Sequence, residues 1–132
     1  MVAYCVNEEK TVPARVVLME LPSKNEIRSK NLVNVVECKM HWQNLGDFLC
    51  VKVERYKKMN IVKEDDKDTT RYSGLYYNFE FFRIREKEIP VDSLEVKETV
   101  FAFAWEPNGQ RFAIISGEGT NRYFNFNTMN YL

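Results

Sequence analysis

The chain has 132 residues and a mass of 15.7 kDa, a size typical of one domain. Nineteen Lys and Arg residues balance nineteen Asp and Glu residues, which argues against a surface built mainly to bind nucleic acid or anionic lipid, although a local basic patch fits within a neutral total. Hydrophobic residues make up 45% of the chain and aromatic residues 14%, enough for a packed core and too many for a disordered chain.

Composition also indicates the compartment. The longest uncharged apolar run, Val100–Trp105, is far too short to span a membrane, and the amino terminus lacks the pattern of a secretory signal. The three cysteines, Cys5, Cys38 and Cys50, are an odd number, and there is no Asn-x-Ser/Thr acceptor. We therefore expect reduced thiols, a cytoplasmic location and no contact with a membrane.

The dominant hydrophobic period is two, which is typical of β-strands. Helical spacing is absent, and the most helix-like stretch, Arg83–Glu98, is interrupted by Pro90. The pattern predicts an all-β chain of about ten short strands in a meander. In chain order these are AYCV, ARVVLMEL, EIRSKNL, Val35–Trp42, Phe48–Tyr56, Tyr77–Arg85, Ser93–Lys97, TVFAFAW, FAIIS and RYFNF.

Two segments of the chain are alike. CKMHWQNLGDFLCVKV surrounds Trp42 and FAFAWEPNGQRFAIIS surrounds Trp105. In each, an alternating strand ends on Trp, a glycine (Gly46 or Gly109) follows four residues later, and a second hydrophobic strand begins at once. We expect the glycines to supply the positive φ of a short hairpin and the tryptophans to fill the layer between neighbouring sheets.

The repeat period is 63 residues, longer than the ~40–45 residues of a propeller blade. Residues 57–76 account for the excess, because they are polar, mixed in charge and predicted to form a loop inserted between two strands. The fold predicted is a partial WD40-like β-propeller. It has one complete four-stranded blade, 34–97 with the inserted loop, between two partial blades, 1–33 and 98–132. The Gly-His and Trp-Asp marks of WD40 repeats are absent.

Two long runs, Pro13–Arg55 and Asn78–Glu118, resemble the family of b subunits of eukaryotic translation initiation factor 3. They include HWQNLGDFLCVKV and AFAWEPNG. The resemblance implies a non-enzymatic scaffold without a cofactor, carrying an RNA-recognition-motif domain, a many-bladed propeller and a helical carboxyl-terminal segment. This chain resembles only later blades of that propeller. The implied partners are other subunits of the factor and the small ribosomal subunit. Residues 57–76 are longer and more acidic than the resemblance leads us to expect.

Catalytic chemistry finds no support among the rarer side chains. His41 is the single histidine, and we expect it to face the neighbouring sheet or a satisfied edge in a structural role. Cys38 and Cys50 lie on consecutive predicted strands and can come close. Two thiols and one histidine make a poor zinc site, so core packing is the simpler interpretation.

Two loop motifs also fail as ligand sites. Gly117–Thr120 lacks the Gly-Lys-Ser/Thr of a phosphate loop and is not followed by a predicted helix. The acidic run around Asp65-Asp66 lacks the spacing of an EF-hand and contains several basic residues, as a solvated loop does. We therefore expect no catalytic, cofactor-binding or metal-binding residues.

One cluster has the composition of a nucleic-acid contact. Arg83, Arg85 and Lys87 follow the aromatic-rich segment 76–82, and aromatics with neighbouring cations form stacking platforms for single-stranded RNA. The alternative is that strand alternation places half of these aromatics in packing between sheets. The three cations are our candidates for a contact with RNA or a partner.

Three functions are therefore compared: a scaffold in translation initiation, an RNA-binding module that contacts rRNA directly, and a generic WD40-like interaction propeller outside translation. A ligand-binding barrel or an enzyme is disfavoured because no convergent polar cluster is visible. An incomplete stack of blades leaves strand edges and sheet faces open. We therefore expect the isolated chain to self-associate.

Overall fold

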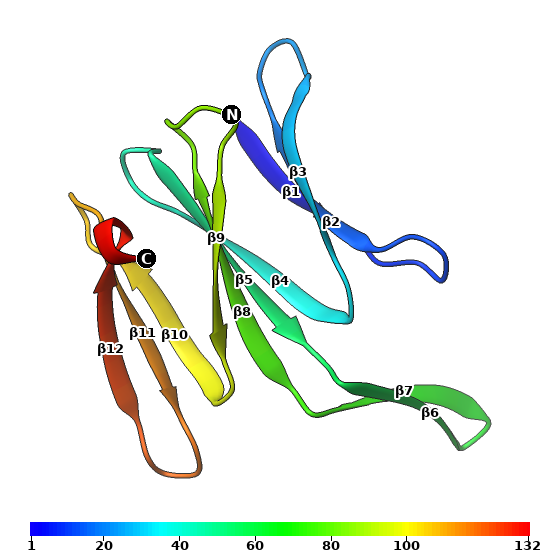
Figure 1. Ribbon diagram of the computed structural model, residues 1–132. Coiled ribbons are helices and arrows are strands. Elements are labelled where there is room, and N and C mark those ends of the chain that lie inside the picture. The colour runs from blue at the N-terminus through cyan, green and yellow to red at the C-terminus, as the bar shows by residue number, and fades with distance from the viewer.

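The computed structural model describes residues 1–132 and contains twelve β-strands and one short 3-10 helix (Figure 1). The strands are β1 Val2–Val6, β2 Ala14–Met19, β3 Glu26–Leu32, β4 Val35–Trp42, β5 Phe48–Arg55, β6 Lys58–Glu64, β7 Lys67–Ser73, β8 Tyr76–Arg83, β9 Val91–Val96, β10 Thr99–Trp105, β11 Arg111–Gly117 and β12 Tyr123–Thr128, and the helix η1 is Met129–Tyr131. The all-β prediction is confirmed. No helix is long and apolar enough to cross a bilayer.

Three antiparallel sheets stand side by side (Figure 1). The first sheet has the order β1-β2-β3, the central sheet β4-β5-β8-β9 and the third sheet β10-β11-β12. Each is a meander of neighbours in sequence, apart from one insertion in the central sheet. One four-stranded sheet between two three-stranded sheets is the partial propeller-like fold expected from the repeat.

The segment 57–76 is not a loop, so the expectation from its polar sequence is wrong. Strands β6 and β7 pair over seven positions to form a two-stranded ribbon, which raises the number of strands to twelve. Its turn residues, Asp65 and Asp66, have φ of 49° and 62°, a conformation that Asp tolerates better than most residues. Nearly all ribbon side chains are exposed, so the ribbon has no buried face and leaves little hydrophobic alternation in the sequence.

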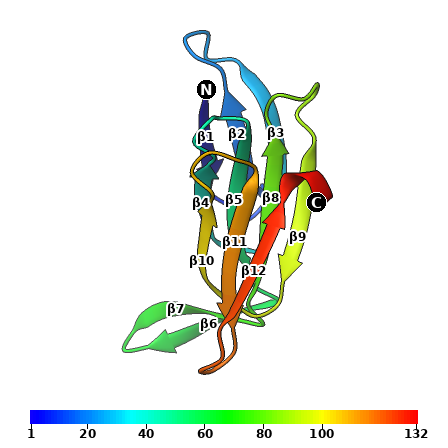
Figure 2. The same ribbon diagram turned by 90° about the vertical axis from the view of Figure 1, so that its left-hand side faces the viewer.

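The ribbon continues the central hairpin of the fold. Strand β5 leads into β6 and β7 leads into β8, with a bend where Lys57 passes Gly74. Gly74 has φ +67°, and a Cβ added there would lie 2.9 Å from the Lys57 Cβ, so the close crossing requires glycine. Beyond the bend the ribbon projects away from the sheets, at the lower right of Figure 1 and the lower left of Figure 2.

Two separate cores hold the three sheets together. Because the central sheet packs against a neighbour on each side, β5 carries apolar side chains on both faces, as strands buried on both faces usually do. Strand β8 turns Phe79 and Phe81 towards the third sheet and Phe82 towards the first. The core between the first and central sheets contains Ala14, Val16, Leu18, Leu32, Leu49, Val51, Val53, Phe82 and Ile89. The core between the central and third sheets contains Phe48, Cys50, Tyr77, Phe79, Phe81, Val100, Phe112, Ile114 and Met129.

A buried carboxylate adds a polar contact to the first of these interfaces. The side chain of Glu80 is 3% exposed and receives the Lys30 Nζ from the first sheet at 2.6 Å. Ser93 of β9 donates its hydroxyl to the same carboxylate, and an Arg55 guanidinium nitrogen lies 4.0 Å away. A buried charge is tolerated when it is paired and hydrogen-bonded. Glu80 thus fixes how the first sheet sits on the central one.

Candidate functional site

Trp105 lies in the layer between the central and third sheets. Its ring centroid is 6.0 Å from those of Phe48 and Phe81 in the central sheet and 5.6 Å from that of Phe112 in its own sheet. The indole Nε1 donates a hydrogen bond to the His41 carbonyl oxygen at 2.8 Å. The apolar ring and the single polar atom of this side chain therefore both bind the neighbouring sheet.

Trp42 occupies the matching position in the central sheet. It pairs across the strands with Leu49 as Trp105 pairs with Phe112, and it packs against the core shared with the first sheet. The indole borders an open hollow beside Met1 and Ile27. In contrast to Trp105, its N–H has no acceptor in the neighbouring sheet.

The hairpin tips that follow the two tryptophans are joined by side-chain amides. The Gln43 Nε2 donates to the Gly109 carbonyl at 2.7 Å, and its Oε1 accepts from the Asp47 amide at 3.0 Å. The Asn44 Nδ2 donates to the Pro107 carbonyl at 2.9 Å. Gln43 is only 2% exposed, yet it is not among the residues predicted from the sequence. Its place directly after a repeated Trp, where the other copy has a Glu, is the signal that could have found it.

The two glycines of the repeat, Gly46 and Gly109, meet different structural requirements. Gly46 has φ +74°, as expected for its hairpin. Gly109 does not lie in the left-handed region, so the expected positive φ is wrong there. A Cβ at Gly109 would collide with the Glu106 carboxylate, which folds over the tip to bind Arg111. Space rather than backbone conformation therefore requires the second glycine.

His41 faces the third sheet and makes no catalytic constellation. Its ring centroid lies 5.0 Å from that of Phe103, and its Nε2 is buried without a hydrogen-bond partner. Burial lowers the pKa of His41, and the positive charges of Lys52 and Lys39 lower it further. The imidazole is therefore held neutral as part of the aromatic layer.

The cysteines are packed thiols. The expected approach of Cys38 to Cys50 is not seen, because the two side chains belong to opposite cores of the central sheet. Cys38 instead lies beside Cys5 of the first sheet; burial, and then this neighbour, raise its pKa to about 12. Burial also raises the pKa of Cys50. Thiols held protonated in this way are poor nucleophiles and metal ligands.

The three candidate cations differ in how far each side chain is buried and paired with other groups of the chain. Arg83 is half-buried, with Nε 2.6 Å from an Asp92 carboxylate oxygen and one Nη donating to the Met129 carbonyl at 2.8 Å. Arg85 has a 70% exposed side chain paired with Asp47 at 3.0 Å. Lys87 is exposed. Of the three, Arg85 and Lys87 are the more exposed to solvent.

The two remaining loop motifs lie in turns between strands. No group of three or more His, Cys, Asp or Glu side chains is arranged to hold a metal ion. Asp65 and Asp66 form the exposed turn of the β6–β7 ribbon. Gly117–Thr120 leads from β11 into β12 and not into a helix, so it has no helix amino terminus to bind phosphate.

Comparisons with known proteins find similarity to translation initiation factors. The model of a family described as eukaryotic translation initiation factor eIF2A matches residues 30–130. Among curated relatives are B subunits of eukaryotic translation initiation factor 3. The chain is 56% identical over 128 residues to the one from Bombyx mori, an alignment that covers 97% of this chain and 18% of that protein. It is 53% identical over 131 residues to the one from Drosophila melanogaster, covering 98% and 19%. The chain thus spans less than a fifth of the length of these relatives.

Replacing Trp105 tests the layer between the central and third sheets. We expect Trp105→Ala to lower the free energy of unfolding by ~3–5 kcal/mol, because a large ring is lost from a packed interface. Trp105→Phe keeps an aromatic ring and loses the N–H···O bond, so a smaller loss of about 1 kcal/mol is expected. Urea unfolding followed by circular dichroism measures both. A nearly neutral alanine variant would contradict this placement of the ring.

The neutral imidazole of His41 makes stability depend on pH. The folded-state pKa lies below the ordinary value of 6.5, so below pH 6.5 the unfolded chain takes up a proton that the folded chain refuses. The stabilisation is complete above pH 6.5 and is lost as the pH falls towards the folded-state pKa. Urea titrations between pH 5.5 and 7.5 should show a steeper loss for wild type than for His41→Gln. Parallel profiles would contradict the burial of a neutral imidazole.

Proposed function

Since the chain belongs to the family of translation initiation factors described as eukaryotic translation initiation factor eIF2A, we propose that it is a non-enzymatic scaffold segment of the initiation factor 3 complex in the cytoplasm. The names of its relatives, which are B subunits of that factor, support this assignment. The mechanism is geometric. Rigid sheets present their edges, faces and loops to other subunits of the factor and to the small ribosomal subunit.

We propose further that the three sheets are an arc of a larger propeller, with residues 34–97 as a complete blade and 1–33 and 98–132 as parts of its neighbours. The matching registers of the two tryptophan hairpins support this division. The same backbone bond closes both tips: Gln43 N to Phe48 O at 3.0 Å and Glu106 N to Arg111 O at 2.9 Å.

The observation that carries the proposal is the outer face of the third sheet. Phe126 pairs with Ala113 as Phe81 pairs with Cys50, and Phe124 pairs with Ile115 as Phe79 pairs with Lys52. In the central sheet Phe79 and Phe81 are completely buried beneath the third sheet, whereas Phe124 and Phe126 are 63% and 78% exposed. Figure 2 looks onto the sheet that carries this exposed pair. The register repeats, but no sheet packs on this face of the third sheet.

An open apolar face of this kind should make the isolated chain self-associate. We expect sedimentation velocity to show concentration-dependent oligomers for wild type. The double variant Phe124→Ser/Phe126→Ser should sediment as a monomer, because the exposed rings drive the contact. Tyr131→Ser, which removes another exposed aromatic beside the third sheet, is the matched control and should behave as wild type. A wild-type chain that is monomeric at its solubility limit would contradict the proposal.

The scaffold function is tested in the longer protein that contains this segment. We expect it to copurify with the other subunits of the factor and to cosediment with small ribosomal subunits. Charge reversal of the two exposed cations, Arg85→Glu and Lys87→Glu, should leave cosedimentation and its salt dependence unchanged.

Two results would change the conclusion. Failure of the longer protein to associate with either partner would overturn the scaffold assignment. Loss of binding in the charge-reversed variant, with a shallower salt dependence, would replace it with direct contact to rRNA, because each lost phosphate contact reduces the salt slope.

A further inference from the structure

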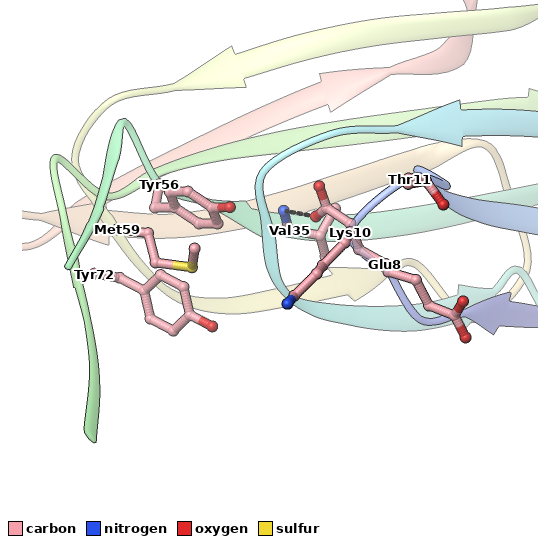
Figure 3. A pocket seen from close by; sticks show the side chains of 8 residues that line it. Glu8, Lys10, Thr11, Val35, Tyr56, Met59 and Tyr72 are labelled. Carbon is pink, nitrogen blue, oxygen red and sulfur yellow. Dashed lines mark hydrogen bonds between the residues drawn. The ribbon is translucent and has the colours of Figure 1, made fainter. Parts of the chain in front are cut away.

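A hollow of about 840 Å³ lies between the root of the β6–β7 ribbon and the loop that joins β1 to β2. Figure 3 shows its two walls: Tyr56, Met59 and Tyr72 gather on one side, and Glu8, Lys10 and Thr11 stand on the other. This volume is in the range of sites that bury a small molecule or a short peptide segment. The proposed scaffold function does not use it.

The ribbon wall is aromatic and prearranged. The Tyr56 and Tyr72 ring centroids are 4.8 Å apart with an interplanar angle of 37°, and Met59 stands opposite Tyr72 in the strand register. The glycine-dependent crossing of Lys57 and Gly74 sets this geometry, because it fixes the direction in which the ribbon leaves the central sheet. Met59 and Tyr72 are 48% and 40% exposed, so the wall presents apolar and π surface to the hollow.

The facing wall carries negative charge on a fixed loop. The two Glu8 carboxylate oxygens accept hydrogen bonds from the amides of Asn34 at 3.3 Å and Val35 at 3.1 Å. Glu9 is held by reciprocal backbone bonds with Val12 at 2.9 and 3.3 Å, and no cation of the chain pairs with its side chain. Burial raises the pKa of Tyr56, and the negative charge of Glu8 and the neighbouring Tyr72 raise it further.

We propose that this hollow binds a lysine or arginine side chain carried by an extended segment of a protein partner. Tyrosine faces attract a cation through their quadrupoles, the Met59 thioether adapts to the aliphatic stem, and the two glutamates attract the charged end. Lys10 is the one basic residue on the rim. It partly neutralises the glutamates and competes with an incoming cation, so its removal strengthens binding.

The Met59 methyl group is a direct reporter of this site. In the chain labelled at methionine methyls with carbon-13, we would titrate four probes: the capped peptide Ala-Ala-Lys-Ala-Ala, its arginine and norleucine counterparts, and hexauridine. We expect the lysine and arginine peptides to move the Met59 signal saturably. Met129, which is completely buried against the third sheet, should stay in place. The norleucine peptide keeps the aliphatic stem without the charge, so it should bind far more weakly.

Point variants separate recognition from folding. Tyr72→Leu should weaken lysine-peptide binding by about two- to fivefold, the range of an exposed cation–π contact. Glu9→Gln should weaken it by up to about fivefold, the range of an exposed ion pair. Lys10→Gln should strengthen it by a similar factor, and Tyr131→Leu should have no effect. Unshifted signals of the buried Met129 and the partly buried Met40 confirm that each variant is folded.

Three outcomes would overturn the proposal. An unresponsive Met59 signal with both cationic peptides would show that the hollow is not a site. An equal response to the norleucine peptide would show apolar contact without recognition of charge. Tighter binding of hexauridine than of the peptides would show that the tyrosines stack nucleic-acid bases instead. None of these results depends on whether the longer protein binds ribosomal subunits, so this proposal and the scaffold function fail separately.

Discussion

Trp105 crosses from the third sheet into the central one, where its ring meets Phe48 and Phe81 and its indole N–H reaches the His41 carbonyl at 2.8 Å. The two contacts depend on each other. The buried rings exclude water from the N–H, which then needs a protein acceptor, and the only geometry that supplies one is the packed geometry. One side chain therefore sets both the distance and the offset between two sheets that share no strand pairing. Gln43 makes a similar contact between the two sheets at the hairpin tip, where both the nitrogen and the oxygen of its side-chain amide are hydrogen-bonded.

The two interfaces of the central sheet use different chemistry. Towards the third sheet the contact is aromatic, with Phe81 and Phe103 at its centre. Towards the first sheet the core is mainly aliphatic, with Phe82 as its completely buried aromatic residue, and its outer part is fixed by the buried Glu80 with Lys30. Aromatic layers tolerate several offsets, whereas a buried ion pair has one good geometry, because a displaced charge loses its partner and keeps its desolvation cost. The first and central sheets are thus held in a more specific alignment than apolar packing alone would give.

The sequence predicted the sheets far better than it predicted the contacts between them. The hydrophobic pattern located the strands, because the faces of a strand that are buried, both in β5 and one in β4, carry apolar residues. The repeat around Trp42 and Trp105 located equivalent strands. The β6–β7 ribbon escaped prediction because a ribbon exposed on both faces has no constraint on its polarity. Gly109 escaped for another reason. Its requirement comes from where the Glu106 side chain folds, and a glycine in a hairpin looks the same whether it serves φ or space.

Contacts made by the site residues were also beyond what the sequence pattern could predict. That Glu80 is buried and paired depends on Lys30, fifty positions away, and a charged residue within an aromatic strand indicates only that a partner is needed, not which one. Similarly, the hollow beside Tyr56 exists because the bend at Gly74 brings Tyr72 back to it. These sites depend on contacts between residues far apart in the chain, and the local sequence pattern contains little information about such contacts.

Hydrogen exchange at the two indole N–H groups tests the central claim, that Trp42 and Trp105 are equivalent positions of one repeat and only Trp105 has its neighbouring acceptor in this chain. The chain has two tryptophans, so their indole signals are easily followed by proton–nitrogen correlation spectra after transfer to D₂O. The account predicts slow exchange for Trp105, whose N–H is partly buried and hydrogen-bonded across the interface, and rapid exchange for Trp42. Rapid exchange of both groups, or protection of Trp42 alone, would contradict it.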